Sequence, residues 1–276
     1  MKSDLVTPRN RFELLKDRLK TRFFDFMLVS LLMGIFLVPY VVWIIVINNA
    51  SAFTVTEENY LMMALIAYAP YIFTSMIFGL GVVGAMYYSK RLAFGEGANA
   101  YKDFFYGISK NIKSGLLGFF IIGLFYFLLS FGKVVIIYSQ SLNPLLKGML
   151  IGLMYVGFIL ITMIVGFYLT QSILYTGKTS QLMSNAIKFT FGMFGWNLLI
   201  FLMLLLPLIL VELVSYLNPV FFLIEYIMLG ICILFYFEFE VFVFSIYSHA
   251  IFDLTINDDY PEIYRKGLAK IDTSDN

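Results

Sequence analysis

The chain has 276 residues, of which 61% are hydrophobic, 18% aromatic and only 13% charged. A soluble domain is about half apolar and about a quarter charged, so lipid must solvate much of this surface. The net charge of +1 provides no basic field for nucleic acid. One cysteine and one histidine exclude an internal disulfide and the usual zinc, haem and iron–sulfur ligand sets. We therefore expect no cofactor, no metal and no catalytic residue.

The start of the chain, residues 1–23, is polar and basic and lacks the short apolar core of a cleavable signal peptide. Within it Phe12, Leu15, Leu19 and Phe23 follow one stripe of a helix between the charges. We expect a basic amphipathic segment here, followed by a first apolar span that is kept as an anchor.

The apolar stretches predict the fold. A membrane-spanning helix needs about 20 predominantly apolar residues. Six stretches meet this requirement: 24–47, 61–89, 114–138, 149–176, 193–214 and 221–251. The prediction is an all-α fold with a single domain, an integral membrane bundle of six transmembrane helices over 24–251, and a tail at 252–276.

Two of these spans contain residues that change helix packing. Glycine lets helices approach closely in lipid, and proline can kink a helix. In the second and third spans these residues include Pro70, Gly79, Gly81, Gly84, Gly115, Gly118 and Gly123.

Basic residues are spread unevenly between the two sides of the predicted bundle. Lysine and arginine gather before the first span, after the second and fourth spans and in the tail, whereas the opposite connections hold Lys133 and Lys147. The positive-inside rule then predicts a multi-pass protein of the cell membrane with both termini in the cytoplasm. An even number of spans agrees with this orientation.

The segment between the second and third spans has a helical pattern of its own. Tyr101, Phe104, Phe105 and Ile108 recur at helical spacing, while Asp103 and the lysines lie elsewhere on the helical wheel. This pattern predicts an amphipathic cytoplasmic elbow helix at the level of the lipid headgroups. Two interpretations remain open: an elbow that packs under the bundle, and a helix that docks a partner protein.

Two further segments show weaker helical patterns. Residues 179–189 form another candidate amphipathic helix between the fourth and fifth spans. In the tail, Asp258 and Asp259 precede Pro261, which predicts a short helix over 262–268.

Residues 81–119, GVVGAMYYSKRLAFGEGANAYKDFFYGISKNIKSGLLGF, resemble the YesL-like membrane proteins of Gram-positive bacteria. The resemblance is best over residues 20–125, which share a basic start, a first span, a glycine-rich second span and an elbow rich in arginine, glycine and phenylalanine. It implies a six-span integral membrane protein of unassigned activity, of a family often associated with carbohydrate uptake of the ABC type. The family supplies no catalytic residues.

The last span carries acidic residues. Glu238 and Glu240 lie near its middle, Glu225 nearer its outer end, and His249 near its cytoplasmic end. A bare carboxylate at the bilayer centre costs at least about 2.5–3.5 kcal/mol, so each should face water, pair with a polar side chain or carry a proton. Residues two apart on a helix lie about 200° apart, whereas eleven residues make about three turns, so only Glu238 shares a face with His249.

Two interpretations of these residues remain open. In one, Glu225, Glu238, Glu240 and His249 form a polar pathway in which carboxylates take up and release protons during transport. In the other, buried glutamates only fix helix packing. The hydrogen-bond partners expected for them are tyrosine hydroxyls and the amides of Asn111, Gln171 and Asn197.

Three functions follow from these patterns. The first is a subunit or accessory of a carbohydrate or solute uptake system, which would contact another membrane-transport subunit through the elbows. The second is a stand-alone transporter or channel that uses Glu238 and Glu240. The third is a membrane-embedded enzyme that acts on lipid. All three share the lipid bilayer as a partner and exclude nucleic acid.

Overall fold

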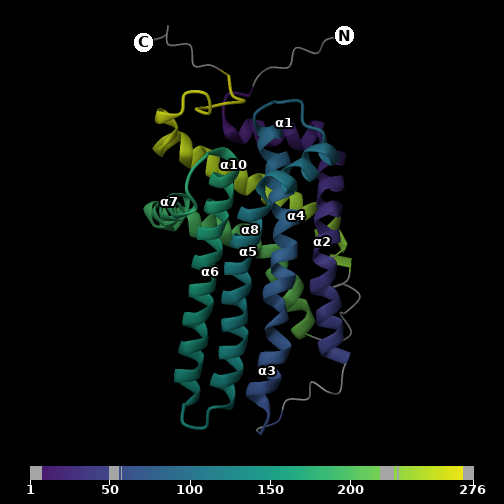
Figure 1. Cartoon of the computed structure of the whole chain (residues 1–276), viewed down its shortest axis with the longest axis vertical. Helices are drawn as coiled ribbons and strands as arrows, with labels where there is room; N and C mark the ends of the chain where they lie inside the picture. The colour runs from purple at the N-terminus through teal and green to yellow at the C-terminus, as the bar shows by residue number, and fades with distance from the viewer. Residues whose placement is uncertain (1–7, 50–55, 57, 218–226, 229, 270–276) are drawn as a thin grey trace. The chain divides into compact units, whose positions relative to one another are not determined.

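The computed structural model describes residues 8–49, 56, 58–217, 227–228 and 230–269, and all regular secondary structure within these ranges is helical (Figure 1). The elements are α1 (Arg11–Thr21), α2 (Phe23–Asn49), α3 (Tyr60–Tyr68), α4 (Pro70–Ala93), α5 (Ala100–Tyr138), α6 (Pro144–Leu174), α7 (Thr179–Gly192), α8 (Phe194–Leu217), the π-helical η3 (Cys232–Tyr236), α10 (Phe237–Thr255) and the 3₁₀-helical η4 (Asn257–Asp259). The predicted all-α fold is confirmed.

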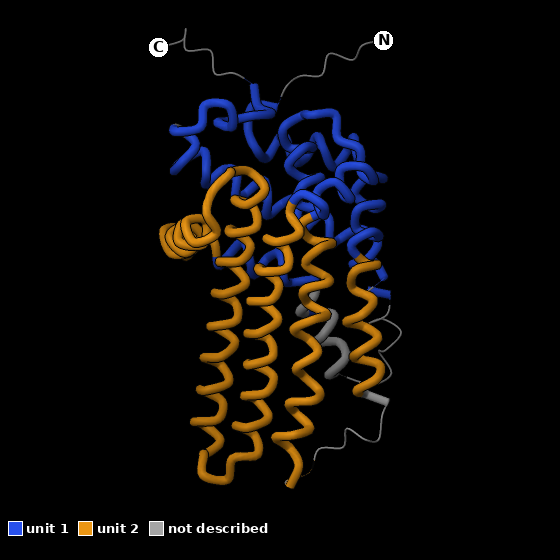
Figure 2. Tube along the Cα trace, viewed as in Figure 1, with its two compact units in different colours: residues 1–33, 84–110, 198–276 blue, residues 34–83, 111–197 orange. Residues whose placement is uncertain are grey.

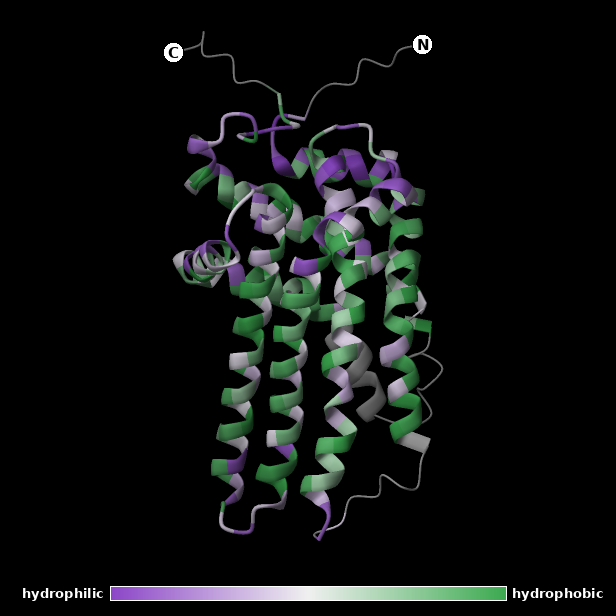
Figure 3. Cartoon of the chain, in the orientation of Figure 1, coloured by the Kyte–Doolittle hydropathy of each residue, from purple (hydrophilic) through white to green (hydrophobic). Residues whose placement is uncertain are grey.

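The described helices are long and apolar enough for an integral membrane protein. Five stretches could each cross a membrane, namely Phe23–Ile47, Tyr60–Ala93, Ala100–Tyr138, Pro144–Leu174 and Cys232–Thr255. A sixth is possible if α7 and the 194–207 part of α8, which meet at 94°, count as one span. Apolar residues cover α2, α5 and α6 along much of their length (Figure 3).

The spans differ from the predicted ones where the chain bends. The second span is divided into α3 and α4 at Pro70, whose ring nitrogen has no hydrogen to donate to the preceding turn. The third begins at Ala100 rather than 114, because the amphipathic segment runs directly into it and breaks from helical geometry only at Asn111, with φ −117° and ψ 18°. Of the sixth predicted span, residues 221–226 and 229 lie outside the described residues, and α10 continues to Thr255.

The chain divides into two compact units (Figure 2). Unit 1 comprises residues 1–33, 84–110 and 198–276, and unit 2 comprises residues 34–83 and 111–197. Helices α2, α4, α5 and α8 contribute residues to both units. The single-domain organisation stays a prediction.

Unit 2 is built on close helix approach at glycine, as the sequence indicates. A Cβ atom on Gly115 of α5 would lie 3.0 Å from the carbonyl oxygen of Gly79 on α4. A Cβ atom on Gly123 would lie 2.9 Å from the Cα of Ile72. Because backbone atoms cannot rotate away as a side chain can, these positions leave no space for a methyl group.

The predicted amphipathic helix at 179–189 is present as α7. It buries Leu182, Ala186 and Phe189, and it is seen along its axis beside α6 in Figure 1. The buried Gln171 side chain of α6 donates to the Leu182 carbonyl at 3.3 Å, which joins the two helices within unit 2. At the bend after α7, the Asn197 amide donates to the Phe189 carbonyl at 2.7 Å and so satisfies a group at the helix end.

Unit 1 holds α1 against the end of α10 and the chain that follows it. The Arg11 guanidinium pairs with Asp253 at 2.7 Å and donates to the Lys266 carbonyl at 3.1 Å. The predicted tail helix over 262–268 is wrong, since residues 261–267 form successive turns. Arg265, with φ 49°, and Gly267, with φ 87°, lie in the left-handed region, which ends any regular right-handed helix.

Gly123→Ala should destabilise the protein by about 1–3 kcal/mol, because the added methyl group meets the backbone of α4. The matched control is Gly157→Ala on α6, where an added Cβ meets nothing within 4 Å. That variant should be stabilised by about 0.5–1 kcal/mol through the loss of glycine flexibility. Thermal unfolding of both variants in detergent measures the difference, and equal effects would contradict the described packing.

Candidate functional site

The buried part of α10 carries four polar side chains among apolar ones. Glu238 and Ser248 are 0% exposed, and Ser245 and His249 are 2% exposed. Residues 238, 245 and 249 are separated by seven and four positions, so they follow nearly one line along the helix. Glu238 and His249, which the sequence places on one face, are thus both buried within unit 1.

Glu238 has one partner that the structure describes. The hydroxyl of Ser89 on α4, itself fully buried, donates to Oε1 of Glu238 at 2.7 Å. The second carboxyl oxygen, Oε2, is buried and has no hydrogen-bond partner among the described residues. The buried hydroxyl of Tyr88, which lies in the electrostatic field of Glu238 and Asp25, likewise has no hydrogen bond of good geometry.

Other polar groups of α10 also lack hydrogen-bond partners. The hydroxyls of Ser245 and Ser248 and Nδ1 of His249 are buried without a hydrogen-bond partner in the described part of the chain. We call Ser89, Glu238, Ser245, Ser248 and His249 the polar line. Buried polar groups in proteins are nearly always bonded to protein or to ordered water, so a run of such atoms on one helix face is unusual.

His249 lies at one end of the polar line. Its ring is 5.4 Å from that of Phe94, centroid to centroid, and Arg11 and Lys90 are its charged neighbours. Nε of Arg11 is also buried without a hydrogen-bond partner among the described residues. Basic groups therefore adjoin the polar line at the end opposite Glu238.

The other two members of the predicted pathway are placed differently. Glu240 is partly exposed and has Tyr236 and Cys232 as neighbours rather than the polar line. Glu225 lies outside the described residues. Of the four predicted pathway residues, the structure therefore brings Glu238 and His249 to one buried face.

The predicted docking elbow is split between two environments. Phe104 is fully buried against Gly84, and Ile108 is partly buried beside it. Tyr101 is 62% exposed and Phe105 39% exposed, with ring centroids 4.8 Å apart. One side of the helix start thus packs inside unit 1, and the other leaves Tyr101, Phe105 and Tyr106 exposed.

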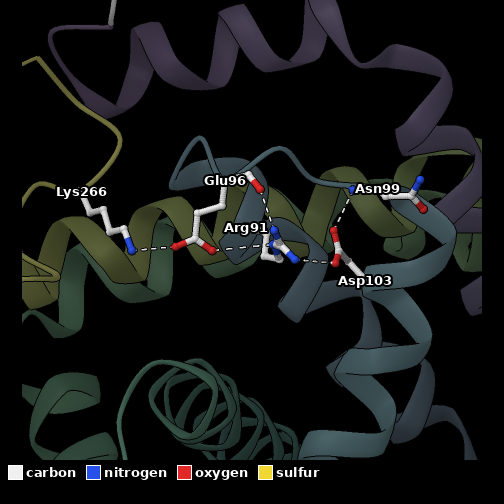
Figure 4. A network of polar contacts seen from close by, with 5 residues as sticks. All are labelled: Arg91, Glu96, Asn99, Asp103 and Lys266. Atoms are coloured by element: carbon white, nitrogen blue, oxygen red, sulfur yellow. Dashed lines mark hydrogen bonds and ion pairs between the residues drawn. The ribbon is translucent and has the colours of Figure 1, made fainter.

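A network of charged groups fixes the loop between α4 and α5 (Figure 4). Arg91 pairs with Asp103 at 2.9 Å and donates to the Glu96 carbonyl at 2.7 Å. The Glu96 side chain accepts from Lys266 at 2.6 Å, and Asp103 accepts from the Asn99 backbone N–H at 2.7 Å. Asp103 is only 3% exposed, so it is a buried ion-pair partner and does not belong to the solvent-exposed side of an elbow.

Sequence reasoning missed Ser89 and the pairing of Asp103. Ser89 is one serine in an apolar span, and its partner is 149 positions away, so no local pattern marks it. The local sequence does hold a signal near Asp103, namely a helix cap. Asn99, four residues earlier, is a favoured capping residue, and its side chain accepts a hydrogen bond from the Lys102 backbone N–H at 2.9 Å.

Within the described ranges, no three or more His, Cys, Asp or Glu side chains gather so that they could hold a metal ion. Comparisons of the chain with protein-family models, with curated proteins and with solved structures find no match.

Ser89→Ala should destabilise the protein by about 1–3 kcal/mol. It removes the one described donor to Oε1 of the fully buried Glu238, so neither carboxyl oxygen then has a described hydrogen-bond donor. Ser109→Ala is the matched control, since that serine is exposed and bonds only to its own helix at Phe105. Its effect should be within about 0.5 kcal/mol. Unfolding in detergent compares the two, and equal stabilities would show that the Ser89–Glu238 bond adds nothing.

Proposed function

We propose that this integral membrane protein is a transporter or channel in which the polar line conducts protons or a small polar solute. The observation that carries the proposal is the run of buried, unpaired polar atoms from Glu238 to His249. A carboxyl group and an imidazole are both able to take up and release a proton, and the serine hydroxyls between them can donate and accept hydrogen bonds.

The physical cost of the arrangement supports this function. Each unsatisfied buried polar group costs about 1–3 kcal/mol, and the polar line holds several. Ordered water removes this cost by bonding to two or more such groups. A packing role needs only the single bond from Ser89 to Glu238, whereas Ser245, Ser248 and His249 require an additional bonding partner.

The polar line is long enough to form part of a path across the membrane. Eleven residues of α-helix separate Glu238 from His249, a rise of about 16 Å. A hydrocarbon core is about 30 Å thick, so the line accounts for roughly half of a crossing.

Proton flux in proteoliposomes with an internal pH-sensitive dye tests the function. Glu238→Gln keeps an acceptor for Ser89 but cannot release a proton, so its flux should fall to that of empty liposomes. Glu240→Gln removes the same charge from the same helix off the polar line, so it should retain most of the wild-type flux. If wild-type protein passes no protons, the same liposomes are assayed for uptake of small sugars. Wild-type flux in the Glu238→Gln variant would refute the proposal.

A second candidate is a subunit or accessory of a carbohydrate or solute uptake system in the cell membrane. The exposed rings of Tyr101 and Phe105 favour it, because aromatic residues are enriched where proteins meet. The resemblance of residues 81–119 to the YesL-like family supports it as well. The distribution of lysine and arginine supports a cytoplasmic location for this elbow and for both termini.

Photo-crosslinking in cells separates this candidate from the first. A photoreactive amino acid at Tyr101 should give a discrete adduct with a second membrane-transport protein, identified by mass spectrometry. The same amino acid at Leu153, which is 67% exposed on the apolar helix α6, is the control and should give only lipid adducts. Lipid adducts alone at both positions would remove the second candidate.

A further inference from the structure

A pocket in unit 1 lies beside the charged network and apart from the polar line. Its volume is about 240 Å³, and its charged lining consists of Arg18, Arg22, Arg91, Asp17 and Glu96. Arg18 belongs to α1, Arg22 to the junction of α1 and α2, and Arg91 to the end of α4. Each of the three arginines also has a carboxylate partner, since Arg18 pairs with Asp17, Arg22 with Asp25 and Arg91 with Asp103.

Two of these arginines carry unused donors. Nε of Arg18 and Nε of Arg91 are both buried and have no hydrogen-bond partner among the residues that the structure describes. Of their other nitrogens, Nη1 of Arg18 pairs with Asp17 at 3.2 Å, and Nη1 and Nη2 of Arg91 donate to Asp103 at 2.9 Å and to the Glu96 carbonyl at 2.7 Å. A buried guanidinium donor without an acceptor is costly, so this pocket has a deficit of acceptor oxygens.

The carboxylates of the lining are already neutralised. Asp17 is held by Arg18, and Glu96 accepts from Lys266 at 2.6 Å and lies 3.7 Å from Nε of Arg91. They restrict the charge that the pocket can accept, because each repels an anion that comes near. A ligand with one negative charge and several acceptor oxygens fits this balance better than a dianion.

The pocket lies at the ends of membrane-spanning segments. Arg22 immediately precedes the span that begins at Phe23, and Arg91 is in the last turn of the span that ends at Ala93. Phospholipid phosphates lie at the ends of such apolar spans, where arginine is well suited to bind them.

We propose that this pocket binds a singly charged phosphodiester group through Arg18 and Arg91. The group is either the headgroup of an anionic phospholipid or a soluble phosphodiester. In both cases the phosphate oxygens accept from the two guanidinium Nε–H groups, and Arg22, which is 45% exposed and pairs with Asp25 at 3.3 Å, also lines the pocket.

Thermal unfolding in detergent tests the site with three probes. Phosphatidylglycerol supplies the phosphodiester on a lipid, dioleoylglycerol supplies the lipid without the phosphate, and dimethyl phosphate supplies the phosphodiester without the lipid. The wild-type protein should be stabilised by phosphatidylglycerol and not by dioleoylglycerol. A comparable shift with dimethyl phosphate identifies a soluble ligand, and its absence identifies a lipid headgroup. No shift with either phosphodiester overturns the proposal.

Substitutions locate the binding. Arg18→Gln should weaken phosphodiester binding by about tenfold or more, the equivalent of one charge-assisted hydrogen bond. Arg18→Lys keeps the charge beside Asp17 but lacks the Nε–H group, so it should lose most of the binding, and it replaces Arg18→Gln if that variant does not fold. Lys20→Gln removes one charge from an exposed position on the same helix and should bind as the wild type does. Equal losses in Arg18→Gln and Lys20→Gln, or full binding by Arg18→Lys, would overturn the site.

Discussion

The absence of bulk water inside a membrane bundle is the constraint on which the polar chemistry of this protein depends. Each polar side chain that faces inward must find its hydrogen bonds in the protein or in a few ordered waters, at a cost of about 1–3 kcal/mol if it does not. One of the two carboxyl oxygens of Glu238 accepts a hydrogen bond from Ser89. Ser245, Ser248 and His249 of α10 are buried as well. A helix that served only as an anchor would place apolar residues at these positions.

The two units solve this constraint in different ways. The described helices of unit 2 pack mainly through apolar surfaces and through glycines such as Gly115 and Gly123, which allow the backbones to approach closely. Unit 1 instead assembles charged and hydroxyl groups from distant parts of the chain, as in the bonds from Arg11 to Asp253 and from Ser89 to Glu238. The polar line and the arginine pocket both lie in unit 1, so the chemistry of the described chain is concentrated there.

The parts of the structure that could be predicted are those that depend on the length of apolar stretches and on the local spacing of apolar residues. Span length and composition predict the all-α bundle, and the apolar spacing in residues 179–189 predicts α7. Ser89 could not be found this way, because a hydrogen bond across 149 positions leaves no local pattern. The helical wheel places Asp103 on the polar side of an elbow, because a wheel records position and not the presence of Arg91. The tail was predicted as a helix because composition does not reveal the left-handed backbone of Arg265.

The composition of unit 1 from three separate segments has a consequence for how the protein is made. Its first two segments, 1–33 and 84–110, leave the ribosome long before residues 198–276, which supply α10. Ser89, which lies in the second spanning stretch, therefore enters the bilayer region before its acceptor Glu238 has been made, and it must stay accessible to water or to the insertion machinery. Unit 2 has all its residues by position 197, so it can complete its packing first, and the docking of α10 then closes unit 1 as a late step of biogenesis.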